Sequence, residues 1–317
     1  YQPRFWCGRS IGNFPNGMLA RLFLLVAMVG LFVVIGTSEL DWFSVRDEER
    51  QDVQTPSSDR VRVPLTKEET PMEVSGTISE TATLSTAIGG VVPHHLVASS
   101  MLADFFSLLS KRAARPTTIL LLAPNHFEVG EATIQTTPVL WETAFGMIET
   151  DPELLRDVRE GGAEIQPETF IEEHGIYNIL PYVAHFLPGA KVVPVVFRYD
   201  MTTLEREQFI ASILPRIRTG EVFVVSSIDF SHYLPQAEAE RKDKETWEAL
   251  QDFDLSKIAR FGSDHLDSPG AMLTLLRIGQ ELQATNLTVL RHGNSADTIR
   301  GRNSSTTSHF TIILSKK

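Results

Sequence analysis

The chain has 317 residues, of which 42% are hydrophobic, so it is long enough to bury the core of one large domain or two modest domains. Its 40 acidic and 29 basic residues give a net charge of -11, and the absence of any run of Lys or Arg excludes the basic surface typical of a nucleic-acid-binding protein. Cys7 is the single cysteine and precedes the part that looks globular, which excludes a disulfide framework and a cluster of thiolate metal ligands.

Residues 18–36 form an apolar segment that is interrupted only by Arg21, and its length is close to the roughly 20 residues that span a bilayer as a helix. Arginines precede the segment and acidic residues follow it. The positive-inside rule therefore predicts a single-pass membrane protein with residues 1–17 in the cytoplasm and the globular domain outside the cytoplasm. A cleaved signal peptide is the alternative, but the apolar run is long for such a peptide.

Residues 37–81 are charged and rich in Ser, Thr and Pro, without a sustained apolar period. A segment of this composition buries too little apolar surface to offset the entropy lost when the chain is ordered. We therefore expect a disordered acidic linker, followed by one globular domain over residues 82–317.

From residue 82 onward, short apolar runs alternate with segments whose apolar residues recur at helical spacing. The expected strands are residues 83–92, 117–123, 131–137, 191–198, 221–227, 287–291 and 309–314. The expected helices are residues 96–114, a short helix opened by Asp151 and Pro152, residues 174–187, 202–218 and 236–251, and a helix that begins after Pro269. This alternation predicts an α/β domain with a mostly parallel central sheet flanked by helices.

Three of the expected strands run directly into loops that carry histidines. These loops contain Pro93-His94-His95, Pro124-Asn125-His126 and Asp229-Phe230-Ser231-His232. In open α/β sheets, ligands bind beyond the carboxyl ends of the strands. If the three strands are parallel, their loops share one edge, and three imidazoles with a carboxylate would form a metal or acid/base site there.

Other polar residues are weaker candidates for this site. His174 lies at an expected helix start, where capping or support of another ligand is as reasonable as a ligand role. His265 and Asp267 occupy the loop that leads into the helix at Pro269, although Ser268 and Pro269 are also ordinary capping chemistry. His95 is interpreted as the spare member of its pair.

The segments GGVVPHH, APNHF, EEHGIYNILPY, SSIDFSH and HLDSPGAM occur in the order and spacing typical of the Memo-like proteins, whose bacterial members are called AmmeMemoRadiSam system protein B. The resemblance covers residues 85–314 and implies the fold of the class III extradiol dioxygenases, which hold a non-haem Fe(II) with two histidines and a carboxylate. It implies that His94 and His126 are metal ligands and that His232 is an acid/base with Asp229 beside it. The family name also implies radical-SAM system partners.

The third ligand is the point at which this sequence departs from its relatives. Memo-like proteins of the animal type carry a cysteine in a Cys-Gly-Arg-His-Pro stretch, and counting back from Pro269 places His265 at that position. Asp267 is the alternative, and it would complete a 2-His-1-carboxylate site suited to Fe(II). Three histidines would suit copper, zinc or iron.

Together these features predict a metal-dependent, dioxygenase-like oxidoreductase that acts on a small molecule or a peptide. In this hypothesis His94, His126 and His265 hold a divalent metal, with Fe(II) preferred over copper or zinc. His232, oriented by Asp229, moves a proton. The secondary candidates for a ligand or a supporting role are Asp267, His174, His95 and Asn125. A metallohydrolase and a non-catalytic ligand- or peptide-binding protein remain open as alternatives.

Overall fold

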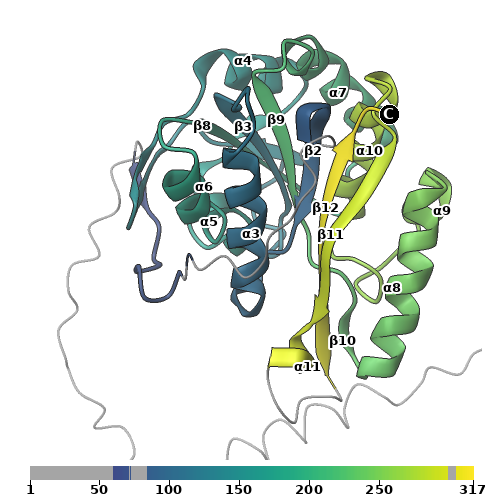
Figure 1. Cartoon of the computed structure of the whole chain (residues 1–317). Helices are drawn as coiled ribbons and strands as arrows, with labels where there is room; N and C mark the ends of the chain where they lie inside the picture. Colours follow the sequence, from purple (N-terminus) through teal and green to yellow (C-terminus); the bar gives the residue numbers. More distant parts are fainter. Residues whose placement is uncertain (1–59, 71, 73–83, 299–304) are drawn as a thin grey trace, which may run out of the picture. The chain divides into compact units, whose positions relative to one another are not determined.

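The computed structural model describes residues 60–70, 72, 84–298 and 305–317 (Figure 1). The described strands are β1 (Arg60–Arg62), β2 (Ala87–Val92), β3 (Thr118–Pro124), β4 (Ile134–Thr136), β5 (Leu140–Thr143), β6 (Gly146–Ile148), β7 (Glu164–Ile165), β8 (Lys191–Phe197), β9 (Val222–Ser227), β10 (His232–Leu234), β11 (Asn286–Asn294) and β12 (Thr306–Ser315). The described helices are α3 (Ser99–Ser110), α4 (Pro152–Glu160), α5 (His174–Tyr177), α6 (Leu180–Phe186), α7 (Thr203–Ile217), α8 (Gln236–Gln251), α9 (Leu255–Ile258), α10 (Pro269–Glu281) and α11 (Ser295–Thr298), with 3-10 helices η1 (Leu96–Ala98) and η2 (Pro167–Phe170).

The expected membrane anchor, residues 18–36, lies outside the described residues. Among the residues that the structure describes, every helix is too short or too polar to cross a bilayer. The anchor therefore stays a prediction.

The large sheet has the strand order β10-β12-β2-β9-β3-β8-β4-β7, and β11 pairs with β12. Its four central strands, β2, β9, β3 and β8, are parallel to one another. Towards the edges, β12 is antiparallel to β2, and β4 is antiparallel to β8. The prediction of a mostly parallel central sheet is thus confirmed, and the carboxyl ends of β2, β3 and β9 meet at one edge.

Helices cover both faces of this sheet, because alternate side chains of the buried strands point to opposite sides. In β3, Leu120 and Leu122 join a core shared with α7 and α10, whereas Ile119 and Leu121 join a core shared with α3 and α6 (Figure 1). Each fully buried leucine contributes about 1.5–3 kcal/mol. Packing on both faces holds the ends of these strands in fixed positions.

A small second sheet corrects the expectation that residues 37–81 are entirely linker. β1 is parallel to β5, and β6 is antiparallel to β5 on its other side. Val61 and Val63 are buried in the same core as Trp141, and the Val63 amide donates to the carbonyl of Glu142 at 2.8 Å. The physical reason is the alternation of valine and arginine in residues 60–63, which gives this charged segment one apolar face.

Helix ends follow the capping residues of the sequence. Asp151 caps α4 by accepting from the amides of Glu153 and Leu154, as expected. The single helix expected over residues 174–187 is instead two short helices, α5 and α6. Pro181 lies in the first turn of α6, because a proline lacks the amide hydrogen that a helix interior requires.

Candidate metal centre

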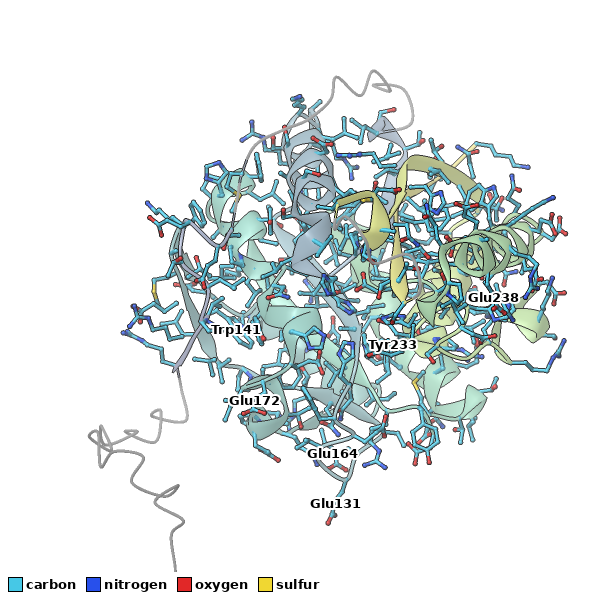
Figure 2. The ribbon with its side chains drawn as sticks, turned by 90° about the horizontal axis from the view of Figure 1, so that it is seen from below. Glu131, Trp141, Glu164, Glu172, Tyr233 and Glu238 are labelled. Atoms are coloured by element: carbon cyan, nitrogen blue, oxygen red, sulfur yellow. The ribbon has the colours of Figure 1, made fainter. Side chains whose placement is uncertain are left out.

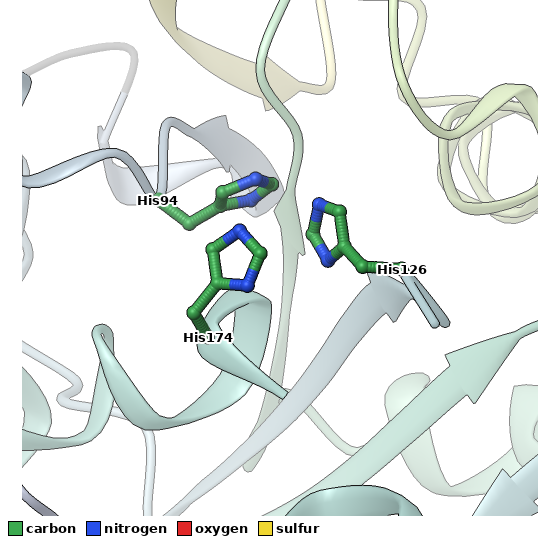
Figure 3. A group of neighbouring side chains, drawn as sticks. All are labelled: His94, His126 and His174. Atoms are coloured by element: carbon green, nitrogen blue, oxygen red, sulfur yellow. The ribbon is translucent and has the colours of Figure 1, made fainter. Parts of the chain in front are cut away.

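Three imidazole rings come together at the carboxyl edge of the sheet (Figure 3). His94 follows β2, His126 follows β3, and His174 is the first residue of α5. One ligand nitrogen from each ring lies within 4.8 Å of the other two. The rings of His126 and His174 stack at a centroid distance of 4.0 Å, and the ring of His94 stands nearly perpendicular to both.

His94 is buried and held by hydrogen bonds on every side. Its amide donates to Asp229 Oδ1 at 3.1 Å, and its carbonyl accepts from Asn178 Nδ2 at 2.8 Å. Its ring Nδ1 lies 3.1 Å from the hydroxyl of Ser227. The remaining ring nitrogen, Nε2, lies 3.2 Å from Asp267 Oδ2 and 3.5 Å from Asp229 Oδ2. The ring therefore presents Nε2 to a group of carboxylate oxygens.

His126 is oriented by the fully buried carboxylate of Glu173. Glu173 Oε1 lies 2.6 Å from His126 Nδ1 and accepts from the amide of Gly175 at 2.8 Å, while Oε2 accepts from the His126 amide at 2.9 Å. A carboxylate at Nδ1 keeps the ring proton on that nitrogen and leaves the lone pair on Nε2. This arrangement is typical of histidines that bind metals.

Asp267 supplies a fourth potential metal ligand, between the rings of His94 and His126. Its Oδ2 lies 3.2 Å from His94 Nε2 and 3.7 Å from His126 Nε2. Among the described residues, its other oxygen, Oδ1, is buried without a hydrogen-bond partner. A buried carboxylate oxygen without a donor is costly, so the site is electrostatically suited to a cation.

The charges of the site act on its histidines in opposite directions. Burial alone lowers the pKa of His94, but Asp229 and Asp267 outweigh this effect and raise it. Burial also lowers the pKa of His126, whereas hydrogen bonds and charges from Asp267 and Glu173 raise it to about 10. For His174, burial and the neighbouring charges of His126 and His94 lower the pKa to about 4. A metal ion would have to displace protons from His94 and His126 before binding them.

The donor set fits a divalent metal ion. Metal–nitrogen bonds of about 2.1 Å place the ligand nitrogens of a tetrahedral site roughly 3.4 Å apart, so nitrogens that lie within 4.8 Å of one another would approach by up to roughly 1.4 Å on binding. Imidazole and carboxylate donors without thiolate suit iron, zinc or copper. These residues could therefore hold a metal, and its identity is left open by the geometry.

His265, the expected third ligand, lies outside this group, and the structure corrects that expectation. Its Nδ1 lies 3.1 Å from Asp264 Oδ1, its Nε2 lies 3.2 Å from Glu245 Oε2, and its ring stacks on Phe261. The amide of His265 donates to the carbonyl of Gly262 in a turn, and the contacts of its ring are with Asp264, Glu245 and Phe261 and not with His94 or His126. The distance in sequence from Pro269 identifies the correct loop, but it does not predict the conformation of that loop. Asp267 is the residue of the loop that faces His94.

Asp229 and His232 lie next to the histidine group. Asp229 is buried, and although burial raises its pKa, the charges of His94 and His309 lower it strongly. His232 begins β10, and its Nδ1 is buried without a hydrogen-bond partner among the described residues. The positive charge of a protonated His232 also contributes to lowering the pKa of Asp229.

His309 was not among the candidates, yet its Nδ1 lies 3.2 Å from Asp229 Oδ1. It comes from β12, which reaches the site by pairing antiparallel with β2. No local motif marks this residue, because its position depends on a pairing between distant parts of the chain.

The remaining candidates have local roles. His95 Nδ1 accepts from the amide of Val97 and so caps η1, and its ring lies 5.9 Å from that of His309. Asn125 closes a turn with Val129, donating to the Val129 carbonyl at 2.7 Å and accepting from its amide at 3.1 Å. Neither side chain belongs to the group around His94.

A cavity of about 670 Å³ opens beside the site, and its lining includes His126 and Asp267. Seen from the carboxyl end of the strands, Glu172, beside Glu173, and Tyr233, beside His232, both lie on this end of the domain (Figure 2). The arrangement therefore combines a group of metal donors with space for a small molecule.

The fold and the site define an α/β protein with a histidine group that could hold a metal. The family model described as Memo-like protein matches residues 67–313, and the chain belongs to this family. It is 27% identical over 217 residues to a "MEMO1 family protein" of Caldivirga maquilingensis, covering 66% of this chain and 76% of the relative. It is 28% identical over 218 residues to a "MEMO1 family protein" of Methanococcoides burtonii, covering 66% and 80%.

Among solved structures, the chain is similar to that of an uncharacterised protein from Escherichia coli K12. The match has a TM-score of 0.46 and 13% sequence identity, and it covers 70% of this chain and 98% of the other. The resemblance of the sequence to the Memo-like proteins is confirmed by the family match.

Proposed function

We propose that this protein is a metal-dependent oxidoreductase, similar to the extradiol dioxygenases, that acts on a small organic molecule. The observation that carries the proposal is the approach of Asp267 Oδ2 to the Nε2 atoms of both His94 and His126, at 3.2 and 3.7 Å. Two imidazoles and one carboxylate are the donors that non-haem Fe(II) oxygenases use.

His94, His126 and Asp267 would hold the ion, with His174 as a further donor on the open side of His126. When bound, a metal ion in this position supplies Lewis acidity and, if it is iron or copper, redox chemistry towards dioxygen. Glu173 holds a proton of His126 on Nδ1, so that Nε2 is the nitrogen that would give up its proton and bind the metal. Fe(II) is preferred because a carboxylate accompanies the two imidazoles.

His232 is the residue that would move a proton. Its buried Nδ1 has no hydrogen-bond partner among the described residues, so no internal group fixes the proton of this ring, as an acid/base requires. Asp229 accepts from the amide of His94 and contacts the ring of His309. We therefore assign Asp229 the role of positioning the neighbouring histidines.

Elemental analysis of the full chain, purified without a metal-affinity tag and without added metal, tests this function. We expect about one ion of iron per chain and its loss in His94→Ala and His126→Ala, because each change removes a donor. The control is His185→Ala, since His185 lies on α6 with its ring against Phe145 and Phe186. His232→Ala should keep the metal as well.

Full metal occupancy in both ligand variants would contradict the proposed centre. If the wild-type chain binds zinc and hydrolyses substrates equally well with and without dioxygen, the metallohydrolase alternative replaces the oxidoreductase. If metal binds but no substrate panel gives turnover, the protein is a ligand-binding member of the family.

A further inference from the structure

The cavity beside the metal donors extends to the first turn of α7, where Arg206 lines its wall. Arg198 lines the same cavity. Two guanidinium groups therefore border the space into which a substrate would fit, and their partners decide which of them is available to a ligand.

The charge of Arg198 is already used within the protein. Its Nε lies 3.3 Å from Glu128 Oε2 and 3.2 Å from Asp200 Oδ1. Its Nη1 donates to the carbonyls of Glu128 and Gly130. Two carboxylates and two carbonyls thus surround this side chain, so it contributes little attraction to a further anion.

Arg206 is in the opposite situation. It is 9% exposed, and among the described residues its buried Nε has no hydrogen-bond partner. The nearest carboxylate is that of Glu207, at 3.8 Å, and Glu207 is itself bound by Arg277 at 2.9 to 3.3 Å. The long contact with Glu207 leaves the guanidinium without a hydrogen-bonded carboxylate, and an anionic ligand in the cavity would bind the Arg206 atoms that line it.

The backbone around Arg206 also favours a negative charge. Thr203, the first residue of α7, and Gly270, in the first turn of α10, line the same cavity. The amides of a first helical turn and the helix dipole attract anions. Two helices of 15 and 13 residues begin at this wall, and although Thr202 and Ser268 each cap one first-turn amide, the positive ends of both helix dipoles lie there.

The rest of the wall is partly apolar. Its larger apolar side chains are Phe197, Met201, Phe261, Leu266 and Leu273. A planar guanidinium matches a carboxylate or a phosphate equally well in shape. Because Arg206 has only the long contact with Glu207, and because Glu128 and Asp267 add negative charge to the same wall, a monoanion fits better than a dianionic phosphate.

We propose that the substrate is an organic carboxylate with an apolar body, whose carboxylate group is bound by Arg206 while its other end reaches His126 and Asp267. This assignment of a substrate class rests on the proposed function of the same site. The carboxylate end is recognised by the protein alone and does not require the metal.

Calorimetric titration of the full chain after treatment with a chelator tests the assignment. The probes are 4-phenylbutyrate and its neutral amide, 4-phenylbutyramide, which differ in charge but hardly in size. We expect the wild-type chain to bind the acid at least about tenfold more tightly than the amide, because only the acid forms charge-assisted hydrogen bonds with Arg206. Arg206→Gln should weaken binding of the acid by about 10- to 100-fold and leave binding of the amide nearly unchanged.

Two further variants make the test specific. Arg206→Lys should recover part of the affinity, because it keeps the charge but not the planar fork. Arg216→Gln is the matched control, since Arg216 lies on the same helix but pairs with Glu153 and Asp157 outside the cavity. It should bind the acid as the wild type does.

Equal affinity of the wild-type chain for the acid and the amide overturns the assignment, and this comparison needs no variant. Unchanged binding of the acid by folded Arg206→Gln overturns it too, as does tighter binding of phenyl phosphate than of 4-phenylbutyrate. Because the titration is done without metal, these outcomes are independent of the metal analysis. A chain that binds the acid but no metal would retain this inference and lose the proposed function.

Discussion

Replacement of Glu173 by glutamine tests whether Glu173 orients His126 for binding a metal ion. The Glu173 carboxylate accepts three hydrogen bonds, from His126 Nδ1 and the amides of His126 and Gly175, at 2.6, 2.9 and 2.8 Å. Glutamine has the same size, but its amide nitrogen cannot accept. Whichever way the new amide turns, at least one buried donor loses its acceptor, which costs about 1–3 kcal/mol of stability.

The effect on metal binding should be similar in free energy to this variant's effect on the stability of the fold. Loss of the carboxylate that orients a metal-binding histidine typically weakens metal affinity about 10- to 100-fold, equivalent to roughly 1.4–2.7 kcal/mol. The assay is competition for the metal against a chelator of known affinity, using the full chain. Glu172→Gln is the matched control, because Glu172 is the exposed neighbour of Glu173 (Figure 2). If Glu173→Gln retains the metal as tightly as wild type and Glu172→Gln, then Glu173 does not prepare His126 as a ligand.

Two further predictions concern stability. Asp151→Ala removes the cap of α4 and the acceptor of the Thr118 hydroxyl at 2.6 Å, and should cost about 2 kcal/mol in chemical denaturation at pH 7. Burial raises the pKa of Asp151, but hydrogen bonds from Thr118 and two amides outweigh this effect, so the pKa in the folded protein is lowered. The contribution of Asp151 to stability is therefore fully present above the unfolded pKa of about 3.9 and is lost as the pH falls through the folded pKa. If the difference in unfolding free energy between the wild type and Asp151→Ala does not shrink below about pH 4, this prediction is wrong. Gly90→Ala should destabilise the fold by at least about 1–3 kcal/mol, because the new Cβ would lie 2.4 Å from the carbonyl oxygen of Ile312. Gly262→Ala is the control, since its new Cβ meets nothing closer than 3.4 Å. Equal melting temperatures for the two variants would refute this reasoning.

The long elements of the fold follow from the sequence because each carries its own periodic signal. The buried runs of β3, β8 and β9 and the helix over residues 236–251 were expected within a residue or two of where they lie. The strands β7 and β10, with two and three residues, are too short to show any period. They form where the larger sheet offers an edge, and a local pattern does not report that.

Some residues of the candidate site could likewise be predicted from the sequence, and others could not. His94 and His126 were expected because each follows a buried strand, and the parallel sheet brings both to one edge. The choice between His265, Asp267 and His174 depended on loop conformations for which residue order holds no direct signal. The ring of His265 makes its contacts elsewhere, and the short helix α5 brings His174 against His126.

The pairing of β1 with β5 has a practical consequence for work with shortened forms of the chain. The family match begins at residue 67, after β1, so trimming to that boundary would delete Arg60–Arg62 and uncover one side of β5. The stripped strand would offer free amides and carbonyls to other molecules, a common route to aggregation. If such a truncated protein precipitates, the cause would be the loss of β1 beside β5 and not an unstable metal site.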